Sequence, residues 1–297
     1  MKPTITTLFV VACLASTGCN EAPPPPSQKA APTAAVPEET KLVPFVVPNE
    51  ADIKDSVLLA SIRRGKALIH STKDSLPRYV GARLTCANCH VQDGTVADAM
   101  PLVGAYSRFP QYRARSGEVD LLEDRVNDCF QRSMNGKAIP VKSPEMRDIV
   151  TYIAFLSRGI PPGKDMQGQG VPKLEPLKGD TARGHQLFLA KCAKCHNVDG
   201  GGNSAVPPLW GAQSYNIGAG MARVRSAAAF IHQVMPLDSP RTLTPQQAFD
   251  VATYINTRPR PDFKGKENDW PRGGAPADVA YPTIGSSKTA GTSTPNH

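Results

Sequence analysis

The sequence contains one five-residue pattern twice, at residues 86–90 and 192–196: two cysteines separated by two residues and followed at once by a histidine. Thiols in this spacing add to the vinyl groups of a c-type haem, and the adjacent histidine ligates the iron. A thiol redox pair or a zinc knuckle would leave that histidine unexplained in both copies. The pattern therefore predicts two covalently bound haem c groups. Their attachment residues are Cys86, Cys89, Cys192 and Cys195, and their iron ligands include His90 and His196.

The seven cysteines of the chain do not all belong to this pattern. Four are haem-attachment residues, Cys13 and Cys19 lie in an N-terminal leader, and Cys129 is left without a partner in the sequence. We therefore expect no disulfide in the mature chain.

Residues 1–18 have the features of a signal peptide. Lys2 precedes an apolar run from residue 5 to residue 15, which indicates export across the inner membrane to the periplasm. The surroundings of Cys19 resemble the site at which bacterial lipoproteins are cleaved and acylated, although Ser16 stands where leucine is commoner. A lipid anchor through Cys19 and an ordinary signal peptide cut near this point both remain open.

Composition divides the remaining chain into five segments. Residues 19–49, rich in proline and alanine, are expected to form a stiff tether. We expect an N-terminal haem domain over 50–160, a linker over 161–179 and a C-terminal haem domain over 180–263. The two haem domains are each near a domain size of about 100 residues. Residues 264–297 are expected to wrap the fold or to be disordered. No run after the leader is long and apolar enough to span a bilayer.

The formal net charge of +8 will be reduced by the propionates of the haems. It argues against indiscriminate binding of polyanions and for a locally basic surface. No nucleic-acid-binding module is recognisable in the sequence, so nucleic acid is not expected as a partner.

An internal repeat divides the chain into two similar halves. Each half begins with an amphipathic helical pattern and closes with another. The closing helices start at Ser143-Pro144 and Thr244-Pro245, where an N-cap residue precedes proline at the first helical position. The expected fold class is all-α, with two tandem class I-like cytochrome c domains that each carry one covalently attached haem. The matched segments are 64–68 with 183–187 and 148–153 with 250–255.

The repeat also indicates the second axial ligand of each haem. Met235 follows His196 by 39 residues, and the residue at the same distance after His90 is Cys129. Met235 precedes a proline, as expected in a ligand loop, and methionine raises the potential of a haem. A thiolate ligand donates charge to the iron and lowers the potential. Electrons are therefore expected to pass from the first haem to the second.

Cys129 has other interpretations as well. A lone thiol can be buried as a small hydrophobic group, and three methionines are alternative ligands of the first haem. The matched spacing favours Cys129 over each of them. The three are Met100, Met134 and Met146.

Arginines surround Cys129 in the sequence. Residues 118–134 have helical periodicity, which places Arg125 one turn before Cys129 and Arg132 one turn after it. A solvated basic face is the ordinary interpretation of such a run. However, positive charge would hold Cys129 as a thiolate, and guanidinium groups suit a small oxyanion, so we expect an anionic substrate at the first haem. Further arginines lie just upstream, at Arg108, Arg113 and Arg115.

Three separated motifs occur together in this order: YRAR at 112–115, LEDRVNDCFQRSMNGK at 122–137 and FIHQVMP at 230–236. They resemble the dihaem thiosulfate dehydrogenases of bacterial periplasms, and the similarity runs from about residue 60 to residue 270. The resemblance implies oxidation of two thiosulfate ions to tetrathionate, with electrons passed to a soluble cytochrome c or similar acceptor. Some members of this family run efficiently in reverse.

The resemblance also implies roles for single residues. In some members, a lysine just before the methionine ligates the second haem and exchanges with that methionine. Val234 holds this place here and cannot ligate iron, so no such exchange is expected. The implied ligands are His90 and Cys129 at the active-site haem and His196 and Met235 at the electron-exit haem, and the implied substrate-binding residues are Arg115 and Arg125.

Our functional hypothesis makes Cys129 both an iron ligand and a covalent catalyst, but two other classes share part of the pattern. A non-catalytic dihaem electron carrier explains both haem motifs but not a cysteine surrounded by arginine. A sulfur-oxidising cytochrome subunit, which loads thiosulfate onto the cysteine of a carrier protein, also has a cysteine-ligated haem. The three motifs and the methionine-ligated second haem favour the standalone dehydrogenase.

Overall fold

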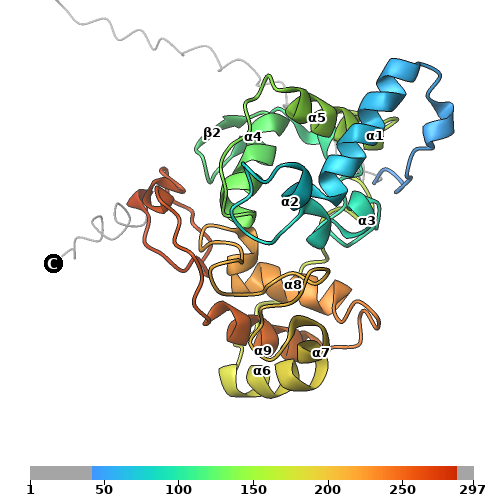
Figure 1. The fold of residues 1–297 in the computed structure, drawn as a ribbon. Helices are drawn as coiled ribbons and strands as arrows, with labels where there is room; N and C mark the ends of the chain where they lie inside the picture. The colour runs from blue at the N-terminus through green and yellow to red at the C-terminus, as the bar shows by residue number, and fades with distance from the viewer. Residues whose placement is uncertain (1–41, 286–297) are drawn as a thin grey trace, which may run out of the picture. The chain divides into compact units, whose positions relative to one another are not determined.

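Helices form nearly all the regular structure of residues 42–285, the part of the chain that this computed structural model describes (Figure 1). The fold is all-α, as the sequence predicts. The α-helices of the first half are α1 (Ser56–His70), α2 (Thr72–Ser75), α3 (Val91–Gly94), α4 (Leu122–Asp128) and α5 (Pro144–Leu156). Those of the second half are α6 (Thr181–Leu187), α7 (Ala193–His196), α8 (Val224–Val234) and α9 (Pro245–Asn256).

Short elements connect these helices. One antiparallel hairpin pairs β1 (Gln111–Arg113) with β2 (Glu118–Asp120). Two π-helical turns are η4 (Cys129–Ser133) and η5 (Phe188–Cys192). The 3-10 turns are η1 (Glu50–Asp52), η2 (Cys86–Asn88), η3 (Tyr106–Arg108), η6 (Gly220–Ala222) and η7 (Lys266–Asn268).

The same helix crossing occurs in each half: α1 packs on α5, and α6 packs on α9. A glycine allows both contacts, because a Cβ at Gly65 would lie 2.0 Å from the carbonyl oxygen of Asp148, and one at Gly184 would lie 2.0 Å from that of Asp250. The sequence repeat is therefore a structural repeat.

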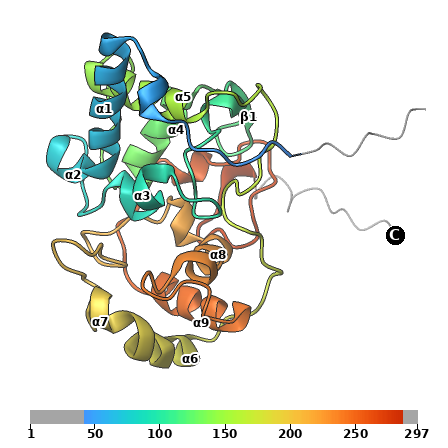
Figure 2. The ribbon, with the colours of Figure 1, turned by 90° about the vertical axis from the view of Figure 1, so that its right-hand side faces the viewer.

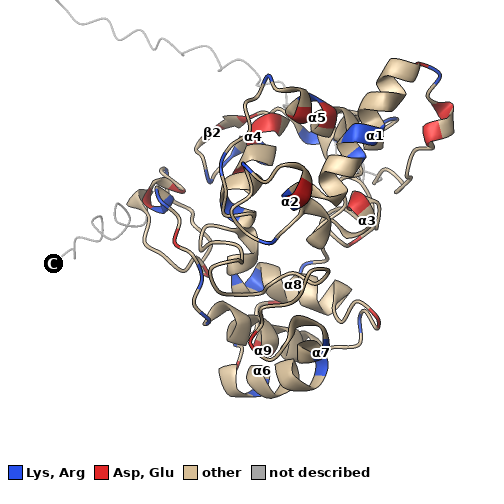
Figure 3. Cartoon of the chain, viewed as in Figure 1, with Lys and Arg blue, Asp and Glu red and all other residues tan. Residues whose placement is uncertain are grey.

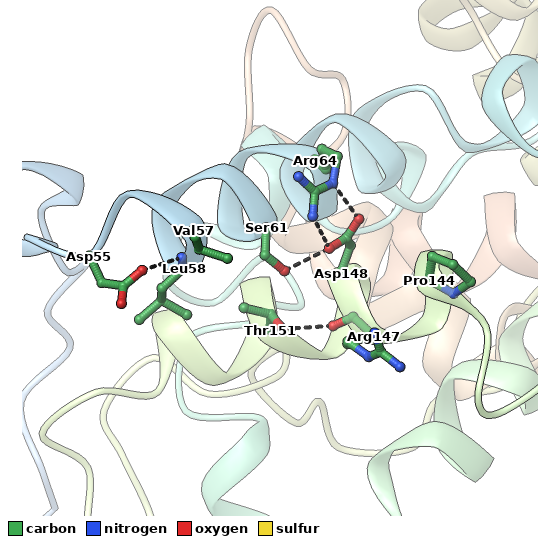
Figure 4. Close-up of a pocket in the computed structure, with 9 residues that line it drawn as sticks. All are labelled: Asp55, Val57, Leu58, Ser61, Arg64, Pro144, Arg147, Asp148 and Thr151. Carbon is green, nitrogen blue, oxygen red and sulfur yellow. Dashed lines mark hydrogen bonds and ion pairs between the residues drawn. The ribbon is translucent and has the colours of Figure 1, made fainter.

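A buried carboxylate fastens each crossing. Asp148 accepts hydrogen bonds from Arg64 Nε at 2.7 Å and from the Ser61 hydroxyl at 2.6 Å, as Figure 4 shows. Asp250 accepts one from Arg183 Nε at 2.8 Å. Burial alone would raise the pKa of both carboxyl groups, but these hydrogen bonds outweigh it and lower the pKa.

The closing helices begin as predicted. Ser143 caps α5 by accepting a hydrogen bond from the amide of Met146, and Thr244 caps α9 by accepting one from the amide of Gln247. Proline occupies the first turn of both helices.

Each half has its own hydrophobic core, and a smaller apolar cluster joins the two. Residues 42–285 belong to one compact unit. Both views place α8 between the helices of the first half and α9 (Figures 1 and 2). Phe230 and Val234 of α8 are buried in one cluster with Ala99 of the first half. Val234 is thus a packing residue of the contact between the halves.

The helix expected over residues 118–134 is wrong at its start. Residues 118–120 form β2 instead, because the chain turns back at Gly117 and pairs with β1. The amide of Leu121 then donates to the Asp124 carboxylate, which starts α4 at the next residue. Val119, in the middle of β2, is 64% exposed.

Parts of the expected tether and linker pack on the first half. Val43 forms an isolated parallel β-bridge with Met166, and both Val43 and Phe45 pack against the first core. Met166, within the linker range, is buried. The predicted signal peptide, Cys19 and the tether up to residue 41 lie outside the described residues, as do residues 286–297. No helix within residues 42–285 is long and apolar enough to cross a membrane.

Candidate active site

The attachment thiols of the first motif lie in a partly buried turn. Cys86 begins η2, and its sulfur accepts a hydrogen bond of 3.2 Å from the Thr72 hydroxyl. Burial raises the pKa of Cys86 and Cys89 to about 12, so both would be neutral thiols before haem attachment.

Both motif histidines are oriented in the same way. His90 Nδ1 lies 2.6 Å from the carbonyl oxygen of Met100, and His196 Nδ1 lies 3.0 Å from that of Pro207. A carbonyl can only accept, so Nδ1 carries the proton and the lone pair of Nε2 is free for iron. The sequence carries a signal for these carbonyl acceptors that lies outside the Cys-X-X-Cys-His motif. In both halves the accepting residue is followed by Pro-Leu-X-Gly, over residues 100–104 and again over 207–211.

A cavity in the first half brings His90 and Cys129 together. Both line it, and His90 is close enough to form a hydrogen bond with the Cys129 thiol. Two residues from separate segments thus line one cavity close to each other, where both could ligate one iron. The rest of the lining is mainly apolar, which fits the ring of a haem. These apolar residues include Ile69, Leu102, Phe109, Leu122, Val126, Phe130, Ile149 and Ile153.

The Cys129 sulfur has a positively charged partner. Arg125 Nη1 donates to Sγ at 2.8 Å, as expected for residues one helical turn apart. Burial would raise the pKa of Cys129, but the charge of Arg125 and the hydrogen bond with His90 outweigh it and lower the pKa to about 7. Cys129 also begins the π-helical turn η4, a conformation that is frequent at functional sites.

The upstream arginines divide into two groups. Arg108 and Arg113 line the cavity, and within the described residues neither side chain forms a hydrogen bond or ion pair. Burial and the charges of Arg125 and Arg108 lower the pKa of Arg113. Arg115 does not line the cavity. Its Nη1 donates to the carbonyl of Gly218 at 2.7 Å, and its guanidinium lies 4.6 Å from the centre of the Trp270 ring.

The alternative methionines of the first half are placed differently from one another. Met134 is buried and lines the cavity, whereas Met146 is fully buried in the core and is not part of the lining. Met100 accepts the hydrogen bond from His90 through its main chain and packs in the cluster that joins the halves. Of these three, Met134 therefore shares the cavity with Cys129.

The second site is more open. Cys195 is exposed, whereas Cys192 and Met235 pack against the second core. Met235 directly follows α8, and its amide donates to the carbonyl of Ile231 at 3.0 Å. His232 Nδ1 donates to the carbonyl of Leu243 and so fastens the loop after α8. Burial lowers the pKa of His196, which favours the neutral imidazole that binds iron.

Two helical halves, each with a Cys-X-X-Cys-His motif and an oriented histidine, define a dihaem cytochrome c. The first half matches the family model described as SoxA/TsdA, cytochrome c domain, over residues 79–161. The second matches the cytochrome c model over residues 181–259.

Similar proteins narrow this class. The thiosulfate dehydrogenase of Allochromatium vinosum is 41% identical over 243 residues, which cover 78% of this chain and 90% of that protein. The thiosulfate dehydrogenase of Psychrobacter arcticus is 38% identical over 240 residues, which cover 78% of this chain and 73% of that protein. The chain belongs to the thiosulfate dehydrogenase family, and it is an oxidoreductase with two covalently bound haem c groups.

A solved structure agrees with this assignment. The thiosulfate dehydrogenase TsdBA from Marichromatium purpuratum, in its as-isolated form, superposes with a TM-score of 0.71 at 39% identity. The match covers 74% of this chain and 50% of that one, so this chain spans about half the length of that protein. The family expected from the three motifs and the fold expected from the internal repeat are thus confirmed.

Proposed function

We propose that the protein oxidises two thiosulfate ions to tetrathionate at its first haem and passes the electrons through its second haem to a soluble cytochrome c or similar acceptor. The single observation that carries this proposal is the partly buried Cys129 sulfur, 2.8 Å from Arg125 Nη1 and in one cavity with His90. An electron carrier needs neither a cysteine nor an arginine there. Each bound haem supplies one-electron acceptance, so two haems take up the two electrons of the reaction.

The chemistry of the chain's own residues follows from Cys129. In the first step, the Cys129 thiolate and one thiosulfate lose two electrons together and form a sulfur–sulfur bond between Sγ and the outer sulfur of thiosulfate. In the second step, the outer sulfur of another thiosulfate attacks that bound sulfur. Tetrathionate then leaves, and the electron pair of the broken bond returns to Sγ as thiolate. Charge and electrons balance in both steps.

Arginines hold the anions during these steps. Arg125 contacts the sulfur that forms the adduct, so it is positioned to bind the sulfonate of the first thiosulfate and to keep Cys129 ionised. Arg113 lines the same cavity without a hydrogen-bonding partner in the described part of the chain, so it is available to a second sulfonate. Arg115, which is held over Trp270, is proposed to help hold the anions from the turn of the hairpin.

The ligand assignments are part of the same proposal. His90 and Cys129 would ligate the first haem, and His196 and Met235 the second. Val234 is buried in the contact between the halves and has no donor atom, so no exchange of ligand with Met235 is expected on reduction. Protein-film voltammetry with thiosulfate and with tetrathionate tests ligation and reversibility, because each direction gives its own catalytic wave.

The decisive experiment uses the purified single chain with thiosulfate and ferricyanide. We expect tetrathionate to accumulate as ferricyanide is reduced. Two methionine-ligated haems without turnover would instead identify an electron carrier, and thiosulfate transfer only to a carrier protein's cysteine would identify a transferase. We also propose a periplasmic location from the predicted leader, and the mass of the mature N-terminus tests both cleavage and a lipid at Cys19.

A further inference from the structure

The segment that follows the second haem domain returns to the first half of the molecule. Its residues 269–281 contact the hairpin, the π-helical turn η4 and helix α8, and the red end of the ribbon can be followed there in Figures 1 and 2. We call four of its residues the C-terminal clamp. They are Asp269, Trp270, Asp278 and Tyr281.

The first clamp contact holds the turn that begins at Cys129. Arg132 of η4 makes two hydrogen bonds of 2.7 Å to the carboxylate of Asp269, and the Tyr281 hydroxyl donates to the same carboxylate at 2.6 Å. Arg132 Nε also donates to Asp128, the residue before Cys129. The guanidinium and the Asp269 carboxylate are 12% and 5% exposed, so this forked ion pair is shielded from water.

The second contact holds Arg115 on the hairpin. The Trp270 ring packs 4.6 Å from its guanidinium, and the Trp270 amide donates to the carbonyl of Arg115 at 2.8 Å. Next to it, a Cβ at Gly117 would lie 2.7 Å from Pro271, so the hairpin and this segment are in close contact. Both the main chain and the side chain of Arg115 are thus fixed by the C-terminal segment.

The third contact reaches the helix that leads to Met235. Asp278 accepts a hydrogen bond of 2.9 Å from the amide of Arg225, in the first turn of α8. The N-cap residue of α8, Arg223, makes no side-chain cap of its own. Asp278 therefore supplies the capping interaction from a distant part of the chain.

We infer that the C-terminal clamp is a positioning element of the active site, which fixes the Cys129 turn and Arg115 relative to each other and to α8. The catalytic part of this inference rests on the proposed function. The clamp residues touch neither substrate nor Cys129 directly and act through Arg132, Asp128 and Arg115. The extension that the sequence left open as wrapping or disordered is thus, over residues 269–281, part of the functional fold.

The test compares two carboxylates that lie seven residues apart, Asp269 and Asp262, in the holoenzyme. Asp269→Asn removes the charge that holds Arg132, whereas Asp262→Asn removes a 70%-exposed carboxylate whose ion pair is with Lys266 and serves as the matched control. We expect Asp269→Asn to lower kcat/KM for thiosulfate by about tenfold to a hundredfold, the size expected when a reacting group is slightly misplaced. Its cysteine-ligated haem should show altered electron paramagnetic resonance, with the potential of the second haem unchanged.

A milder variant guards against loss of folding. Tyr281→Phe keeps the packing and removes one hydrogen bond to Asp269, so it should shift kcat/KM and the spectrum in the same direction by a smaller factor, about threefold to tenfold. Kinetics are measured below the onset of unfolding of each variant. Wild-type kinetics and spectra in both variants, even with a lowered melting temperature, would reduce the clamp to a purely structural role.

The clamp and the proposed function fail in different ways. If the wild-type protein makes no tetrathionate, the proposed function is wrong, but the spectrum of the first haem still reports whether Asp269 positions Cys129. If the wild-type protein is active and Asp269→Asn matches Asp262→Asn in both readouts, only the clamp is wrong.

Discussion

The two halves share a helix crossing. They differ in the surroundings of one equivalent residue, the one that lies 39 positions after the motif histidine. In the first half this residue is Cys129, which begins a π-helical turn and contacts a partly buried arginine. In the second half it is Met235, which ends a regular helix and packs on apolar side chains. One scaffold therefore carries a site suited to chemistry and a site suited to electron exit.

The first half owes its difference to added contacts, not to another fold. The β1–β2 hairpin brings Arg113 to the cavity and carries Arg115 in its turn, and a segment from beyond the second domain holds η4 and Arg115. At the second motif Cys195 is exposed, as expected where electrons leave to a partner. Lysine and arginine occur on both halves (Figure 3), so it is the local surroundings of each haem, more than net charge, that separate the two roles.

The largest effect is expected when the first half is made to copy the second. Cys129→Met should replace a thiolate ligand by a thioether, raise the potential of the first haem and abolish turnover, a loss of about a thousandfold or more for a covalent catalyst. Cys129→Gly should abolish turnover as well. Both variants should keep two attached haems, which haem staining and absorbance check, and full activity in either variant would refute the role of Cys129.

The next effect concerns the charge beside the sulfur. Arg125→Gln should lower kcat/KM for thiosulfate by about tenfold to a hundredfold, because it removes a hydrogen bond from a charged donor to a partly buried sulfur. Arg147→Gln removes an equal charge from the exposed face of α5 and is the matched control. Equal kcat/KM in the two variants would show that Arg125 contributes only net charge.

The complementary change removes the proposed methionine ligand of the second haem. Met235→Gly should lower the potential of the second haem by on the order of 100 mV, because a thioether ligand favours the reduced iron. Electron exit should slow while substrate binding is unchanged, so kcat falls and KM for thiosulfate does not rise. Potentiometric titration checks this, and an unaltered second wave would rule out Met235 as the ligand.

The shared part of the two halves could be predicted from the sequence because its signals are local. Ser143-Pro144 and Thr244-Pro245 each start a helix through contacts within four residues, as predicted. The equal spacing of Cys129 and Met235 from their histidines also needed only the repeat. Local rules of this kind act the same way in both halves.

The part that differs could not be predicted, because it depends on pairs far apart in the chain. Nothing near Arg132 indicates that its partner is Asp269, which lies 137 residues away. Nor could the arginine-rich stretch show which guanidinium lines the cavity, since Arg113 ends β1 and Arg115 lies in the turn after it. The helical periodicity over 118–134 also hid β2, because three-residue strands leave little pattern to read.

The smallest effect should be equal in the two halves. Asp148→Asn and Asp250→Asn each remove the charge that fastens a helix crossing, and each should lower the free energy of unfolding by about 1 kcal/mol. This expected loss of stability is small because the partner arginines are 59% and 56% exposed and remain hydrated without the carboxylate.

The pH dependence of these two variants follows from the lowered pKa of both carboxyl groups. The wild-type advantage is complete above the unfolded carboxyl pKa of about 4 and is lost as pH falls through the lower folded value. Thermal melts at neutral pH and near pH 3 should therefore show the gap between wild type and variant closing in acid. A gap that closes for one carboxylate but not for the other would show that the two crossings, alike in their contacts, differ in the charge around them.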